Sequence, residues 1–149
     1  MPNKTFMAAL GVVIAGVILL PAACSFVRDD DLNQAALAGD ITRCGKLLSK
    51  GASINGAGMH AMKPVMSAAR GGSLETVKYL VSKGADVNAH NDSGSALMWA
   101  VDSHNEQIVE FLLKNGADTT WTNSLGQTAL DFAREKKATN LVGILATRR

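Results

Sequence analysis

Apolar residues recur along this chain at intervals of 32 or 33 residues, and this internal repeat limits the possible folds more than any other feature. One series consists of Leu47, Leu80, Leu112 and Leu145. Two further series keep the same intervals, and they consist of Cys44, Val77, Val109 and Val142, and of Ala35, Ala68, Ala100 and Ala133. A period of this length, shared by three independent positions, is typical of stacked helical units.

Glycine follows the second apolar segment of three of these units, at Gly51, Gly84 and Gly116. Glycine adopts left-handed backbone conformations without a steric cost, so it is suited to end a helix. The repeated alanines are small enough for neighbouring helices to approach closely. A single unit of two short helices cannot bury both of its faces, so the sequence predicts an all-α stack of units.

The sequence of each unit resembles the ankyrin repeat, which has a Thr-Pro-Leu-His turn, a short Ala-rich helix, a second helix that ends in paired leucines, and a Gly-Ala-Asp-Val-Asn-Ala turn. The best match runs through residues 63–69, 74–81 and 84–89. The third unit keeps residues 95–98 and 108–113, and the fourth keeps Gly126, residues 128–130 and Ala133. The resemblance implies an ankyrin-repeat solenoid of about four helix-turn-helix repeats with short hairpin loops. Its repeats are expected at about 29–58, 59–91, 92–123 and 124–149.

The first repeat lacks the characteristic turn, and Asp29, Asp30 and Asp31 stand there instead. Carboxylates at the start of a helix accept hydrogen bonds from its free backbone N–H groups and oppose the positive end of the helix dipole. We therefore expect these three residues to precede the first helix and to cap it. Such a departure suits a terminal repeat, which has a neighbour on one side only.

The N-terminal segment, residues 1–23, has the features of an export signal: Lys4, an apolar run from Phe6 to Leu20, and then Pro21-Ala22-Ala23-Cys24. It resembles a bacterial lipoprotein signal, which is cut before a cysteine that is then lipidated. The resemblance implies lipidation of Cys24, although Pro21 stands where that family usually has leucine. Two other interpretations stay open: a signal peptide cut after Ala23, and an uncleaved membrane anchor.

The length of the apolar run does not separate these interpretations. Fifteen helical residues span about 22 Å, less than the roughly 30 Å hydrocarbon core, but counting on to Val27 gives about 33 Å. All three place the domain outside the cytoplasm, since Lys4 precedes the apolar run and acidic residues follow it. Residues 24–28 would form a tether. If Cys24 is lipidated, the resemblance implies an outer-membrane lipoprotein of the periplasm, because the sorting rule of that family favours the outer membrane when serine follows the cysteine, as Ser25 does here. The alternatives are a soluble periplasmic protein and one anchored in the inner membrane.

Net charge and cysteine content exclude two classes of protein. Removing residues 1–23 takes away Lys4 only, so 15 basic residues become 14 against 13 acidic ones. This balance argues against a nucleic-acid-binding protein, which needs a clustered cationic face. Two cysteines cannot support a disulfide-rich scaffold. Cys44 falls on a repeated apolar position, so we expect a small buried hydrophobic residue there.

No catalytic, cofactor or metal site is expected from the sequence. His60, His90 and His104 are 30 and 14 residues apart, which is not a metal-ligand spacing within one helix or loop. His104 takes the place of the glycine between two helices. The chain contains neither a Gly-x-Ser-x-Gly motif nor a glycine-rich phosphate loop. The sequence therefore predicts a protein that is not an enzyme.

Candidate binding residues follow from the resemblance, because ankyrin proteins usually hold their partner on the concave side formed by loop tips and first helices. Trp121 is the main candidate, since it replaces a small residue where it has no expected core function, and exposed aromatic residues often dominate interfaces. The alternative is that Trp121 folds back over Leu125. Trp99 is expected in the core. The other candidates are Met59, His60, Met62, Arg70, His90, Asp92, Ser93, Asp102, Ser103, Asn123, Ser124, Leu125, Gln127, Glu135 and Lys136.

The predicted function is that of an exported, lipid-tethered and monomeric module that binds a protein partner and no nucleic acid. A narrower prediction, made by analogy with small exported repeat proteins, is an immunity or inhibitor protein that caps a toxin or an enzyme. Two alternatives remain open. One is a structural envelope protein that self-associates, and the other is a periplasmic accessory factor in oxidative-stress defence, as known for some exported ankyrin proteins.

Overall fold

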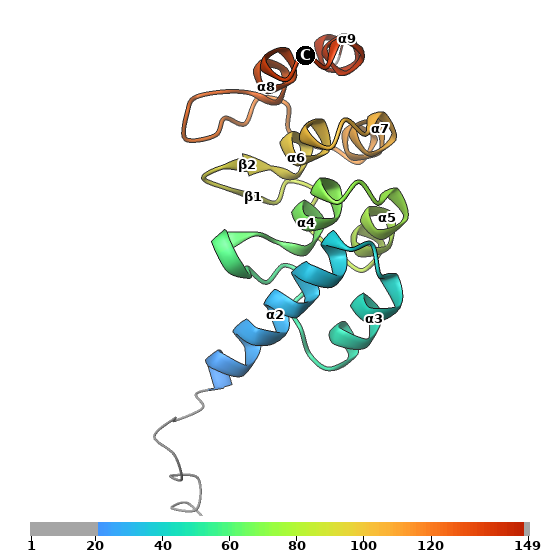
Figure 1. The fold of residues 1–149 in the computed structure, drawn as a ribbon, viewed down its shortest axis with the longest axis vertical. Helices are drawn as coiled ribbons and strands as arrows, with labels where there is room; N and C mark the ends of the chain where they lie inside the picture. The colour runs from blue at the N-terminus through green and yellow to red at the C-terminus, as the bar shows by residue number, and fades with distance from the viewer. Residues whose placement is uncertain (1–20, 148–149) are drawn as a thin grey trace, which may run out of the picture.

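The computed structural model describes the backbone of residues 21–147 and the side chains of residues 28–147. Within these residues the chain forms four helix pairs, which stack along one axis (Figure 1). The elements are α2 (Pro21–Leu37), α3 (Ile41–Ser49), the 3-10 turn η1 (Met59–Ala61), α4 (Pro64–Arg70), α5 (Leu74–Ser82), β1 (His90–Asn91), β2 (Gly94–Ser95), α6 (Ala96–Asp102), α7 (Glu106–Lys114), α8 (Ala129–Glu135) and α9 (Thr139–Ala146).

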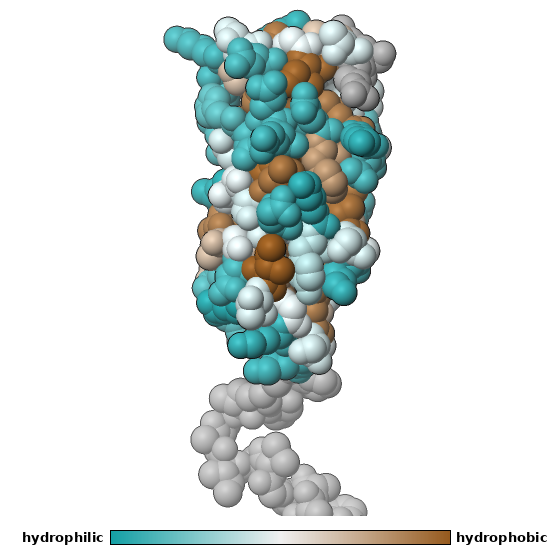
Figure 2. Space-filling model, turned by 90° about the vertical axis from the view of Figure 1, so that its right-hand side faces the viewer, coloured by the Kyte–Doolittle hydropathy of each residue, from teal (hydrophilic) through white to brown (hydrophobic). Residues whose placement is uncertain are grey.

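The stack has two distinct sides. The second helices, α3, α5, α7 and α9, lie on one side, the loops between repeats project on the other, and the first helices lie between them (Figure 1). The two short strands pair antiparallel, with His90 opposite Ser95, and form the second of these loops. On the side of the second helices, apolar patches are interrupted by hydrophilic side chains (Figure 2). The predicted helical stack of repeats is confirmed.

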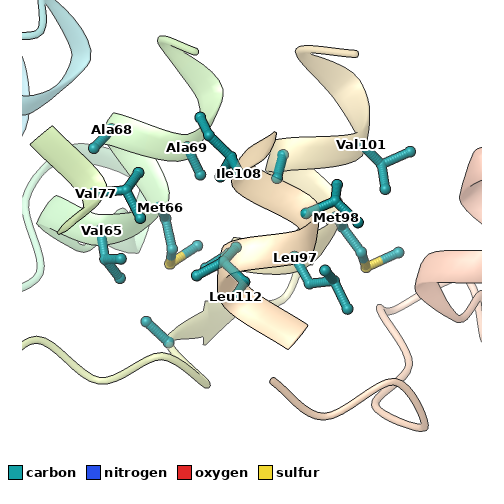
Figure 3. Packing of buried hydrophobic residues seen from close by; sticks show 14 of the residues in the cluster. Val65, Met66, Ala68, Ala69, Val77, Leu97, Met98, Val101, Ile108 and Leu112 are labelled. Carbon is teal, nitrogen blue, oxygen red and sulfur yellow. The ribbon is translucent and has the colours of Figure 1, made fainter. Parts of the chain in front are cut away.

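The core follows the repeated positions of the sequence. Ala35, Ala68, Ala100 and Ala133 are fully buried, because α4 packs between α2 and α6, and α6 packs against α8. Larger residues such as Val65, Met66 and Leu97 fill the space between successive helix pairs (Figure 3). Cys44 is also fully buried, as expected for a small hydrophobic residue.

The turns between elements need left-handed backbone conformations. Gly51, Gly84 and Gly116 have φ values of 89°, 94° and 86°, which confirms the predicted helix ends. The same conformation occurs between the two helices of each repeat. In the first two repeats glycine takes this position, at Gly39 and Gly72. In the third and fourth repeats the position is taken by His104 (φ 52°) and Lys137 (φ 56°).

Asparagine side chains join each turn to the next. The side chain of Asn55 donates to Gly84 O (3.2 Å) and accepts from Asp86 N (2.8 Å). One repeat later, Asn88 donates to Gly116 O (3.3 Å) and accepts from Asp118 N (2.7 Å). These bonds fix the spacing between successive repeats.

The expectation that the three aspartates precede and cap the first helix is wrong. Helix α2 begins at Pro21, so Asp29, Asp30 and Asp31 lie in its interior, and residues 24–28 are helical as well. Their carboxylates contact the rest of the first repeat instead. Asp29 Oδ1 accepts from Ser53 N at 2.7 Å, and Asp31 Oδ1 lies 3.5 Å from the Arg43 guanidinium. The repeat pattern could not locate the start of α2, because the helix continues into residues that precede the repeat.

The predicted export segment lies mostly outside the described residues. Residues 1–20 are not described, and the backbone of Cys24 belongs to α2 while its side chain lies outside the description. Cleavage and lipidation therefore stay predictions. Among the helices within residues 21–147, none combines the length and the apolar character needed to cross a membrane.

Candidate functional site

A groove of about 110 Å³ opens between α2, the first loop and α4. We call it the first-repeat groove, and its lining residues are Asp30, Asn33, Gln34, Leu37, Met59, Met62, Ser67 and Arg70. It contains two large hydrophobic residues that are well exposed, Leu37 at 45% and Met59 at 58%. Exposed apolar side chains that share one concave surface are typical of a binding site.

One face of α2 forms a wall of the first-repeat groove. Asp30 precedes the adjacent pair Asn33 and Gln34 by three and four residues, and Leu37 follows the pair by four and three residues, so the four residues lie on the same side of the helix. Near the end of this face the polar residues give way to exposed Leu37. The opposite wall comes from α4, through Ser67 and Arg70.

Hydrogen bonds hold the first loop against α2 and so fix the shape of the groove. Asn33 is buried, and its Nδ2 donates to Met62 O at 3.0 Å. Asp30 Oδ1 accepts from Met59 N at 3.1 Å, while Asp30 Oδ2 accepts from Gln34 Nε2 at 3.1 Å. The exposed side chain of Met59 is therefore carried by a backbone that α2 positions.

Charges of opposite sign flank the apolar part of the groove. Asp30 lies on the α2 wall and Arg70 on the α4 wall. The Arg70 guanidinium carbon lies 5.1 Å from the centre of the Trp99 ring, a cation–π contact that joins α4 to α6. Trp99 is partly buried and packs against the core, in line with its predicted position.

Trp121, the main sequence candidate, lies in the third loop and contacts the second. Its ring centre is 4.9 Å from that of His90, with 38° between the ring planes. Both residues line a pocket of about 160 Å³ together with Val87, Asn88, Ser95, Leu97, Ala117 and Asp118. Trp121 is half-buried and packs against the core, so the expectation that it has no packing function is wrong. Leu125 remains 79% exposed.

Asn123 does not belong with the exposed candidates, because it is only 8% exposed. Its Oδ1 accepts from the backbone N–H groups of Leu125 and Gln127, both at 3.0 Å. Its Nδ2 donates to Gln127 Oε1 at 3.1 Å, and the Gln127 amide also donates to Glu135. Asn123 and Gln127 thus shape the third loop, a function that the sequence interpretation missed.

Asp102 and Lys136, also candidates for partner binding, bind each other. The Lys136 amine lies 2.8 Å from Asp102 Oδ1, and this ion pair joins α6 to α8. The hydrogen bond to Asp102 raises the pKa of Lys136. Lys136 also lies over the Phe132 ring at 5.0 Å, and Ser103 Oγ donates to Ala100 O. The Asp102–Lys136 pair connects the third repeat to the fourth, whereas the contacts of Lys136 with Phe132 and of Ser103 with Ala100 each lie within one repeat.

The tips of successive loops are tied together through backbone groups. Asn91 Nδ2 donates to His60 O at 2.8 Å, and Ser124 N donates to Asp92 O at 3.0 Å. The side chains of His60, Asp92, Ser93 and Ser124 are exposed at these tips. The loops therefore form one continuous edge beside the first-repeat groove.

Leu37, Asp30, Asn33 and Gln34 were missed by the sequence interpretation, although their helical spacing could have indicated a shared face. As for metal ions, the part of the chain that the structure describes contains no group of three His, Cys, Asp or Glu side chains that could hold one.

Comparison with known proteins identifies the family. The family of ankyrin repeats, in three copies, matches residues 32–123. An ankyrin repeat protein of Acanthamoeba polyphaga mimivirus is 39% identical over 85 residues, which is 54% of this chain and 11% of the relative. A transient receptor potential cation channel subfamily A member 1 homolog of Caenorhabditis elegans is 32% identical over 104 residues, 70% of this chain and 9% of the relative.

A third relative, the ankyrin repeat and SAM domain-containing protein 6 of Rattus norvegicus, is 40% identical over 88 residues, 56% of this chain and 10% of the relative. The chain thus spans about a tenth of the length of these relatives, and the matches do not extend to the rest of each relative. The family match covers more than half of the chain and coincides with the stacked helix pairs. The chain belongs to the ankyrin repeat family.

Proposed function

We propose that this chain is an exported, lipid-tethered module that binds a protein partner in the first-repeat groove and along the adjoining loop tips. Ankyrin repeat proteins generally act through protein–protein interaction, which gives the class of function. One observation supports the location: Leu37 and Met59 are both well exposed and line the same groove.

The composition of the groove suits a protein partner. Interfaces typically combine an apolar centre with a polar rim, and the centre contributes most of the binding free energy. Leu37, Met59 and Met62 provide apolar surface, and Asp30 and Arg70 provide polar groups of both signs at its border. Methionine side chains adapt to the shape of an apolar partner.

The test is chemical crosslinking of the natively produced full chain, followed by affinity capture and mass spectrometry. Met59→Asp places a charge in the groove at an exposed site, so we expect the captured partner to be lost while the fold is kept. Gln107→Asp is the control, because it adds the same charge at an exposed position of α7, and α7 lies on the side of the stack opposite the loop tips (Figure 1). A partner that is captured equally by the wild type and the Met59→Asp variant would contradict the proposal.

Export and lipid attachment are supported by the sequence of residues 1–24, namely Lys4, the apolar run Phe6–Leu20 and Cys24. We expect the full chain to fractionate with membranes and to carry lipid on Cys24. Intact-mass measurement and detergent phase partition of the wild type and of Cys24→Ser test this part separately. A wild-type chain without lipid mass would overturn lipidation without affecting the groove.

A further inference from the structure

Basic side chains gather where α2 meets the C-terminal end of α3. Arg28 Nη1 donates to the backbone carbonyl of Lys50 at 2.7 Å, so its guanidinium lies at the end of α3. Lys46 and Lys50 are four residues apart, which places them on the same side of this helix end, and both are exposed. We call Arg28, Lys46 and Lys50 the basal cluster.

The acidic residues of the first repeat are directed to other contacts. Asp29 is buried and accepts from Ser53 N, Asp30 accepts from Met59 N in the first-repeat groove, and Asp31 pairs with Arg43. Asp40 caps the opposite end of α3, where its Oδ1 accepts from Arg43 N. None of these four contacts involves Lys46 or Lys50.

The turn after α3 also differs in charge from the two later turns. It carries Ser53 where the corresponding positions of the next two turns carry Asp86 and Asp118. In those later repeats an aspartate comes shortly after the lysine at the end of the second helix: Asp86 follows Lys83, and Asp118 follows Lys114. The first repeat has two lysines there and no aspartate in the turn.

The basal cluster lies at the end of the stack from which the N-terminal segment leaves. The N-terminal end of α2 is at the end opposite α8 and α9 (Figure 1). Cys24 precedes Arg28 by four helical residues, or about 6 Å along the axis, and the apolar run Phe6–Leu20 ends next to Pro21. A membrane that holds the chain through either feature would lie within about one Debye length of Arg28, the residue of the cluster on α2.

From this geometry we infer that the basal cluster binds the anionic headgroups of phospholipids and holds the first repeat against the membrane surface. The inference rests on the proposed membrane attachment. Basic residues beside a membrane anchor are attracted by the negative surface potential, and a lipid chain combined with a basic patch attaches more firmly than the chain alone. The contact would fix the orientation of the stack and keep the first-repeat groove close to the membrane.

The test uses the full chain in detergent, added to vesicles of phosphatidylcholine alone or with about 30% phosphatidylglycerol. A membrane-impermeant amine reagent labels exposed lysines, and mass spectrometry quantifies each site. Lys114 is the internal control, because it is exposed and ends the second helix of the third repeat. Helix pairs pack about 10 Å apart, so Lys114 lies about 20 Å farther along the stack than the basal cluster.

We expect labelling of Lys46 and Lys50, relative to Lys114, to fall about tenfold on the anionic vesicles in about 0.1 M NaCl. It should recover in about 1 M NaCl, where the Debye length is about 3 Å. Equal relative labelling on neutral and anionic vesicles would overturn the inference. Flotation with neutral vesicles measures membrane attachment separately. A chain that does not float with neutral vesicles contradicts the attachment. Protection of Lys46 and Lys50 on anionic vesicles would then still support headgroup binding by the basal cluster.

Discussion

The carboxylate of Asp29 accepts a hydrogen bond from the backbone N–H of Ser53 at 2.7 Å, in the first turn of the stack. Asn55 and Asn88 make the corresponding bond to the second and third turns. Asp29 comes from the middle of α2 rather than from a preceding turn. The long first helix therefore supplies the acceptor that a preceding repeat would otherwise provide.

Replacing Asp29 should destabilise the first repeat. Asp29→Ala leaves Ser53 N without its acceptor on α2, so we expect a loss of about 1–3 kcal/mol in the free energy of unfolding. Asp29→Asn keeps an acceptor oxygen on a side chain of the same length and should recover most of that loss. Urea unfolding of the three proteins measures the difference, and equal stability of the alanine and asparagine variants would show that this bond contributes nothing.

Two Gly→Ala replacements should have opposite effects. A Cβ atom at Gly71 would clash with the backbone carbonyl of Leu37, so Gly71→Ala must push α2 away from α4 and should cost about 1–3 kcal/mol. Gly143 lies in α9, and open space surrounds the position that its Cβ atom would take, so Gly143→Ala should add up to about 1 kcal/mol through helix propensity. Thermal unfolding of both variants measures the signs, and a neutral Gly71→Ala would contradict the close approach.

The thiol of Cys44 should react only when the first repeat opens. Burial raises the pKa of Cys44, and the nearby Asp40 carboxylate raises it further, so the thiol stays protonated near neutral pH. We expect iodoacetamide to label Cys44 slowly in buffer and rapidly in urea, in step with unfolding. Peptide mapping distinguishes it from Cys24. Rapid labelling at Cys44 without denaturant would mean that this repeat opens readily.

Acid should weaken the third turn through Asp118. Hydrogen bonds from the hydroxyl and the backbone N–H of Thr120 lower the pKa of Asp118. Because the folded-state pKa lies below the unfolded one, the stabilisation is present above the unfolded value and is lost as the pH falls through the folded value. Thr120→Val removes the hydroxyl donor and should flatten the acid side of the stability profile. Thr122→Val, at an exposed position in the same loop, is the control and should leave the profile unchanged.

The periodic part of this fold could be predicted because it depends on local sequence. Ala68 and Ala100 are buried where the repeat register places them, and Gly51 and Gly84 adopt the left-handed turns that follow it. These features repeat because every unit meets the same neighbour in the same way.

The candidate site could be predicted only in part, because it depends on contacts between residues about 30 positions apart. Trp121 packs on His90 of the preceding loop, and Lys136 pairs with Asp102 of the preceding first helix. The sequence contains both partners but not the distance between them. Leu37 was missed because its exposure follows from how the first loop and α4 surround the end of α2.

The bonds from Asp29, Asn55 and Asn88 all run in one direction, from an earlier residue to a later turn. On a chain that emerges N-terminus first, from the ribosome or across a membrane, each acceptor is therefore available before the turn that it will hold. A newly made repeat can complete its structure on the repeat already in place, without waiting for the rest of the chain. A stack that grows from α2 toward α9 therefore needs none of these three acceptors from a repeat that has not yet been made.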